Sequence, residues 1–255
     1  MAIVTGASRR SAIGAAIVRR LAADGLDLLI HHWEPHDAAQ PCGPDAGAAR
    51  ALAAEARARG GCADDVSLDL AAPDAPAELV ALARELFGGL DVLVANHARS
   101  SRQSLGELTV GELDLCFAVN TRATLLMIQA MIASRPERPG GRVVLFTSGQ
   151  YHDAMPQELP YIASKGALHQ LTGTLAVELM PRGVTVNCVD PGPTDTGYAD
   201  AAGLAALANK IPGGRWGVPD DAARLVRWLV SDDAAWVTGQ VIASDGGWSR
   251  RSRAG

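Results

Sequence analysis

The sequence has few of the residues that mark several common classes of protein. Its four cysteines are widely spaced, without a Cys-x-x-Cys pair or a histidine cluster of zinc-site spacing. The net charge of -5 gives no general attraction to phosphate backbones. There is no signal-peptide pattern and no apolar run of bilayer-spanning length. We therefore expect a cytoplasmic protein with no metal, no nucleic-acid partner and no membrane association.

Apolar strands and helical patterns alternate along all 255 residues. The strands are predicted at residues 2–5, 26–30, 62–70, 90–95, 142–148, 184–189 and 237–244. Residues 31–47 are predicted as an unusually long loop, and residues 194–217 as an Ala/Gly-rich substrate lid. With no linker in between, residues 1–255 are expected to form one domain. Its predicted fold is α/β, a Rossmann-like doubly wound parallel sheet of about seven strands with helices on both faces.

Polar or glycine-containing segments follow several of the predicted strands. Ligands of such a sheet bind outside the carboxyl ends of its strands, so we expect these segments to meet at one edge. They are residues 6–14, Asp69, Asn96, Ser148 and Pro191-Gly192.

Tyr161 and Lys165 lie four residues apart on a helical pattern, which places both on one face. An ammonium near a phenol favours the phenolate and lowers its pKa from about 10. Ser148, at a strand end, is positioned to hydrogen-bond the oxygen that the phenol protonates. An ordinary amphipathic pair is the plainer interpretation. However, the chain has only three tyrosines and two lysines, so a chance pair at this spacing is uncommon.

These segments together resemble the short-chain dehydrogenase/reductase family over almost the whole chain, and most closely its 3-oxoacyl-carrier-protein-reductase-like members. The matching residues follow the family's order: Thr5-Gly6-Ala7-Ser8, Asp69-Leu70, Asn96, Asn120, Ser148, Tyr161-x-x-x-Lys165, Pro191-Gly192 and Asp245-Gly246-Gly247. The resemblance implies an oxidoreductase that interconverts a ketone and a secondary alcohol.

The resemblance also implies a role for each catalytic residue. Tyr161 would be the general acid/base, and Ser148 would orient the carbonyl. Lys165 would lower the pKa of Tyr161 and hold the nicotinamide ribose. Asn120 would hold a water that supplies protons.

For the cofactor, the resemblance places Gly6 and Gly14 at the pyrophosphate, Asp69 at adenine, Asn96 near the adenosine ribose and Thr194 at the carboxamide. Each of the last three has a simpler interpretation as a helix cap or turn residue. The full implied cofactor-binding set is Gly6, Ser8, Arg9, Arg10, Ile13, Gly14, Asp69, Leu70, Asn96, Tyr161, Lys165, Pro191, Gly192 and Thr194.

The chain departs from the family pattern at three places. Its first turn is two residues longer than usual, with Ala12 where a glycine is expected. His97 stands in the segment that usually reads Asn-Asn-Ala-Gly. The second strand carries no acid before Glu34, whereas Arg9 and Arg10 are placed to pair with a 2′-phosphate, so we expect NADP(H) rather than NAD(H).

The leading hypothesis is an NADP(H)-dependent reductase of a 3-oxoacyl or related ketone, free or carrier-bound. Gln150, Tyr151, His152 and residues 194–216 are expected to line the substrate cleft. Two alternatives stay open: a lyase- or epimerase-type reaction on the same scaffold, and a non-catalytic nucleotide-sensing module. The resemblance also implies a homo-oligomer, a tetramer or a dimer, that uses the Asn120 and Tyr161 helices.

Overall fold

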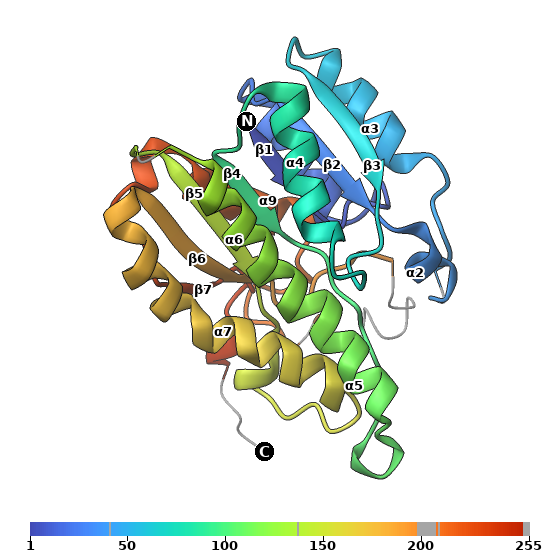
Figure 1. The fold of residues 1–255 in the computed structure, drawn as a ribbon. Coiled ribbons are helices and arrows are strands. Elements are labelled where there is room, and N and C mark those ends of the chain that lie inside the picture. The colour runs from blue at the N-terminus through green and yellow to red at the C-terminus, as the bar shows by residue number, and fades with distance from the viewer. Residues whose placement is uncertain (41, 137, 198–207, 209, 252–255) are drawn as a thin grey trace.

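The computed structural model describes residues 1–40, 42–136, 138–197, 208 and 210–251. Within them, seven parallel strands form one sheet in the order β3-β2-β1-β4-β5-β6-β7 (Figure 1). This confirms the predicted fold class. The strands are β1 (Ala2–Val4), β2 (Leu28–His32), β3 (Ala63–Ser67), β4 (Val92–Ala95), β5 (Gly141–Phe146), β6 (Val184–Asp190) and β7 (Val241–Ala243).

The sheet is covered by helices on both faces (Figure 1). In β1, Ala2 and Val4 belong to one apolar cluster, whereas Ile3 between them belongs to the other, as side-chain alternation requires. The first cluster packs under α1 (Ile13–Ala23), α3 (Ala48–Arg57) and α9 (Pro219–Val230), and the second under α4 (Ala75–Phe87), α6 (Ala123–Ser134) and α7 (Leu159–Leu179). Burial on both faces is why the strands read as continuous apolar runs.

The helical segment between β4 and β5 is not uniform. It comprises α5 (Val110–Cys116), a π-helical turn η2 (Phe117–Arg122) and then α6. Thr109 caps its start, because Thr109 Oγ1 accepts a hydrogen bond from the Glu112 N–H at 3.3 Å.

Contrary to the sequence-based expectation, the stretch Val110–Ser134 is long and apolar enough to cross a bilayer. However, 56% of its apolar window is buried inside the protein. Because α6 packs against α4 in the second apolar cluster, this stretch is a helix of the protein core.

Residues 31–47 were expected to be a loop, but they begin with regular structure. The strand β2 continues to His32, and α2 (Glu34–Ala38) follows almost at once. Pro35 lies in the first turn of α2, where a missing N–H breaks no helical hydrogen bond. This short helix lies beside the carboxyl ends of the strands.

The two ends of the predicted lid are joined. Asp195 N–H donates to Gly217 O, and Gly217 N–H donates to Pro193 O, each at 2.9 Å. Residues 198–207 and 209, which form most of that segment, lie outside the described residues. The lid therefore stays a prediction.

Candidate active site and nucleotide cleft

A cleft of 860 Å³ opens at the carboxyl ends of the central strands. Its volume lies within the range of ligand pockets, about 300–1,000 Å³. Gly6 and Ser8 follow β1, Asp69 follows β3, Asn96 follows β4 and Ser148 follows β5, and all five line the cleft. The structure thus brings together residues that are far apart in the sequence.

Ser148 and Tyr161 lie together at one end of this cleft. Burial raises the pKa of Tyr161 from 10.0 to about 12, and the nearby Ser148 hydroxyl, which lowers this pKa, offsets only part of the rise. The nearby Glu158 carboxylate raises it further. Tyr161 therefore keeps its proton at neutral pH in the free protein.

Lys165 lies on α7 one turn after Tyr161, as the spacing predicts, but its side chain is almost completely buried. It is 2% exposed, and Nζ donates to Phe146 O at 3.0 Å. Burial lowers the pKa of Lys165 from 10.5 to about 8. The net lowering of the Tyr161 pKa that we expected from this ammonium is not found, because burial of the phenol dominates.

Asn120 lies in the π-helical turn and is fully buried. Its Oδ1 accepts from Arg99 N–H at 2.7 Å, and its Nδ2 donates to Arg99 O at 3.0 Å and to Ser164 Oγ at 2.8 Å. The side chain therefore ties the segment after β4 to α7. Both donors of the Asn120 amide already bond to protein groups. The role of holding a water, which the resemblance implies, stays a prediction.

The first turn is shaped by close approach to the segment after β4. Gly6 has a φ of +70°, and a Cβ there would lie 2.6 Å from His97 Cα. A Cβ on Gly14 would lie 2.5 Å from Gly6 O. Helix α1 begins at Ile13, beside the cleft, and has no acidic residue in its first turn. Its unpaired N–H groups suit an anion.

Two buried histidines lie beneath this turn. His31 Nε2 is 2.9 Å from a main-chain carbonyl oxygen, and its Nδ1 accepts from Gly6 N–H at 3.4 Å. His97 Nε2 is 2.9 Å from Val119 O, and its Nδ1 is 2.7 Å from Thr5 Oγ1. Burial lowers the pKa from 6.5 to about 4 for His31 and to about 3 for His97. Both rings are therefore neutral at physiological pH, and both residues also line the cleft.

Comparison with known proteins identifies the relatives of this chain. The family model described as "Enoyl-(Acyl carrier protein) reductase" matches residues 6–249. An uncharacterized oxidoreductase of Bacillus subtilis (strain 168), YjdA, is 35% identical over 228 residues, which cover 89% of this chain and 87% of that protein. The chain belongs to the short-chain dehydrogenase/reductase family.

Solved structures of similar fold agree with this family assignment. The angucycline C-6 ketoreductase LanV with bound NADP superposes with a TM-score of 0.85 at 32% identity, covering 97% of this chain and 95% of that one. A blue fluorescent protein from a metagenomic library, in complex with NADPH, gives a TM-score of 0.86 at 36% identity, covering 97% and 96%.

The predicted site residues of this short-chain dehydrogenase/reductase divide into two groups. Those that line the cleft are Gly6, Ser8, Arg9, Ile13, Asp69, Leu70, Asn96, Ser148 and Tyr161. Those outside its lining are Arg10, Gly14, Asn120, Lys165, Pro191, Gly192 and Thr194.

Arg10 is the clearest member of the second group. Its side chain pairs with Asp45, and its main-chain N–H donates to the same carboxylate at 2.9 Å. Thr194 Oγ1 instead donates to Pro191 O at 2.9 Å, which stabilises the turn after β6.

The residues expected at the substrate end are also arranged differently. Gln150, Tyr151 and His152 are not among the described residues that line the cleft, whereas Met155 and Glu158 are. The Tyr151 ring stacks on His152 with centroids 3.8 Å apart, and His152 Nε2 lies 3.5 Å from an Asp190 carboxylate oxygen.

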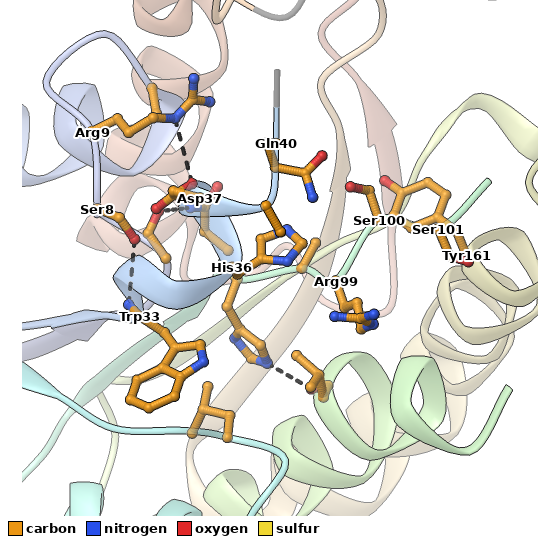
Figure 2. Close-up of a pocket in the computed structure, with 18 of the residues that line it drawn as sticks. Ser8, Arg9, Trp33, His36, Asp37, Gln40, Arg99, Ser100, Ser101 and Tyr161 are labelled. Carbon is orange, nitrogen blue, oxygen red and sulfur yellow. Dashed lines mark hydrogen bonds and ion pairs between the residues drawn. The ribbon is translucent and has the colours of Figure 1, made fainter. Parts of the chain in front are cut away.

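Sequence reasoning missed the contribution of α2 and its neighbours to the cleft. Trp33, His36, Asp37 and Gln40 all line it (Figure 2). Asp37 is 6% exposed, and its Oδ1 lies 3.7 Å from Arg9 Nε. The signal in the sequence was the unusual length of residues 31–47, which indicates a functional segment but not the residues that face the ligand.

Proposed function

We propose that this protein is an NADP(H)-dependent ketoreductase that converts a ketone, a 3-oxoacyl or related compound, into a secondary alcohol. The observation that carries the proposal is that Ser148 and Tyr161 lie together in the lining of the 860 Å³ cleft at the carboxyl ends of the strands. The polar groups around the cleft fit the cofactor: a helix N-terminus and Arg9 can donate to phosphates, and Asp69 can accept from an adenine amino group.

When bound, the nicotinamide supplies a hydride to the carbonyl carbon. Tyr161 donates its proton to the carbonyl oxygen, and Ser148 donates a hydrogen bond that orients this oxygen. A raised Tyr161 pKa keeps the phenol protonated, which supports the direction of ketone reduction. Lys165, buried one turn away, supplies positive charge that stabilises the phenolate left after proton transfer.

The substitution Tyr161→Phe tests the proposal. It removes only the hydroxyl, so we expect folding and NADPH binding to persist while ketone reduction falls by at least about 10²-fold. The measurement is NADPH consumption with a panel of ketones, including 3-oxoacyl thioesters with and without a carrier protein. Turnover of the variant close to that of the wild type would contradict the role of Tyr161.

The same panel separates the two alternatives. A lyase or epimerase would accumulate product without net consumption of NADPH. A nucleotide-sensing module would bind NADPH and turn over none of the ketones. Consumption of one NADPH per alcohol formed supports the reductase.

The preference for NADP(H) is supported by Arg9 in the cleft and by the bound NADP and NADPH of two solved relatives. We expect Arg9→Ala to weaken NADPH binding about tenfold more than NADH binding, because a charge-assisted bond to the 2′-phosphate is lost. Arg10→Ala is the matched control, since Arg10 pairs with Asp45 outside the cleft lining. An equal loss for NADPH and NADH in the Arg9 variant would contradict this assignment.

We further infer a homo-oligomer, a tetramer or a dimer, in the cytoplasm. Apolar side chains are exposed on α5, η2 and α7: Val110 is 75% exposed, Phe117 40% and Val177 79%. A second copy of the chain that packs on these helices would bury them. All four cysteines are free thiols, which fits a reducing compartment. Light scattering on the purified protein tests the assembly, and a monomeric mass would contradict it.

A further inference from the structure

The helix α2 lines the cleft next to the first turn. Figure 2 shows His36 and Gln40 between Arg9 on one side and Arg99 and Tyr161 on the other. Both His36 and Gln40 line the cleft. Residues that follow the second strand therefore lie in the cleft between Arg9 and Tyr161.

Several contacts hold α2 against the first turn. Arg9 Nε lies 3.7 Å from Asp37, and Arg9 Nη1 donates to Cys42 Sγ and to Thr196 O, each at 3.0 Å. Trp33 N–H donates to Ser8 Oγ at 3.4 Å. Because α2 is fixed to the turn that faces the phosphates, His36 is preorganised beside their site.

Two cations and two carboxylates surround His36. It is half-buried, and its charged neighbours are Arg9, Asp37, Arg99 and Glu112. Arg99 is held by Glu112 through two hydrogen bonds, Nε to Oε1 at 2.8 Å and Nη2 to Oε2 at 2.9 Å. Burial lowers the pKa of His36, so the ring is mostly neutral until an anion enters and favours its charged form.

The first turn departs from the glycine pattern that brings the main chain close to a phosphate. A glycine would let the main chain approach a phosphate closely, but Ala12 stands there and the turn is two residues longer. Ala12 is the residue before α1 and lines the cleft. A donor on α2 would compensate for phosphate contacts that this turn makes less closely.

We propose that His36 binds the diphosphate of the dinucleotide cofactor from the side of α2, as a charged donor that takes up a proton when the cofactor binds. This inference rests on the proposed function, because it requires a nicotinamide dinucleotide in the cleft. It assigns a phosphate-binding role to a residue that is not in the cofactor-binding set implied by the family resemblance.

The test measures equilibrium binding by titration calorimetry, with NADP⁺, NAD⁺ and adenosine 2′-monophosphate as probes, between pH 8 and pH 5.5. For the wild type we expect both dinucleotides to bind about tenfold more tightly at pH 5.5 than at pH 8, with proton uptake visible as a dependence of the heat on the buffer. His36→Gln keeps a donor but cannot be protonated, so it should lose the proton uptake and the pH dependence. His36→Ala should weaken both dinucleotides about tenfold at pH 5.5 and leave adenosine 2′-monophosphate unchanged.

The variant His32→Asn is the matched control. His32 lies four residues before His36, outside the lining of the cleft, and faces Asp65 at 3.5 Å. It should bind both dinucleotides as the wild type does.

Equal affinities of the wild type and both His36 variants would overturn the inference while leaving the proposed function intact. A loss confined to NADP⁺, or shared by adenosine 2′-monophosphate, would also overturn it, because His36 would then contact the 2′-phosphate. If the wild type binds neither dinucleotide, both this inference and the proposed function fail.

Discussion

The buried histidines beneath the cleft make stability sensitive to mild acid. His31 and His97 are neutral in the folded protein, with pKa values of about 4 and about 3, against 6.5 for an ordinary histidine. The unfolded chain therefore binds more protons than the folded one below pH 6.5. Their stabilising contribution is complete above pH 6.5 and is lost progressively as the pH falls toward the folded values.

The size of the effect follows from these values. One pKa unit corresponds to about 1.4 kcal/mol, so between pH 8 and pH 5 each histidine removes about 2 kcal/mol from the free energy of unfolding, and the pair about 4 kcal/mol. A folded domain is typically stable by only about 5–15 kcal/mol. Protonation linked to these two histidines would thus remove a large part of the free energy of unfolding at pH 5.

The substitution His97→Asn tests the reasoning, with urea denaturation followed by tryptophan fluorescence at pH 8, 7, 6 and 5. At pH 8 the variant should be less stable by about 1–2 kcal/mol, because the contacts to Thr5 and Val119 are lost. Its stability should then fall by about 2 kcal/mol less than that of the wild type between pH 8 and pH 5. The two curves therefore converge in acid.

The variant His169→Asn controls for the loss of an imidazole as such. His169 lies on α7 against Tyr151, away from the buried pair. In the His169→Asn variant, the free energy of unfolding should still fall with pH as His31 and His97 require. If the wild type and His97→Asn lose stability in parallel from pH 8 to pH 5, the neutral burial of His97 is refuted.

Two further substitutions test the packing that forms the site. Gly14→Ala should destabilise the protein by at least about 2 kcal/mol and weaken NADPH binding, because its Cβ would lie 2.5 Å from Gly6 O; unchanged thermal stability and binding would contradict this. Asn120→Ala should cost about 3 kcal/mol in urea denaturation, since Arg99 and Ser164 lose buried hydrogen-bond partners; a loss below about 1 kcal/mol would show that this amide is not needed there.

The sequence by itself determined the architecture and the order of the site segments. Continuous apolar runs define the strands, since both faces of a parallel sheet must bury apolar side chains, and helical patterns define most of the helices. Because the carboxyl ends of parallel strands share one edge, Gly6, Asp69, Asn96 and Ser148 had to meet there. The four-residue spacing likewise placed Tyr161 and Lys165 on one helix.

Only the tertiary structure decided how these groups are paired and charged. Burial raises the pKa of Tyr161, and Arg10 pairs with Asp45 outside the cleft lining. The position of α2 was also hidden, because five residues of helix carry too little periodicity to separate from a loop. Local spacing fixes which residues share an element, whereas burial, charge pairing and the approach of distant segments depend on the folded chain as a whole.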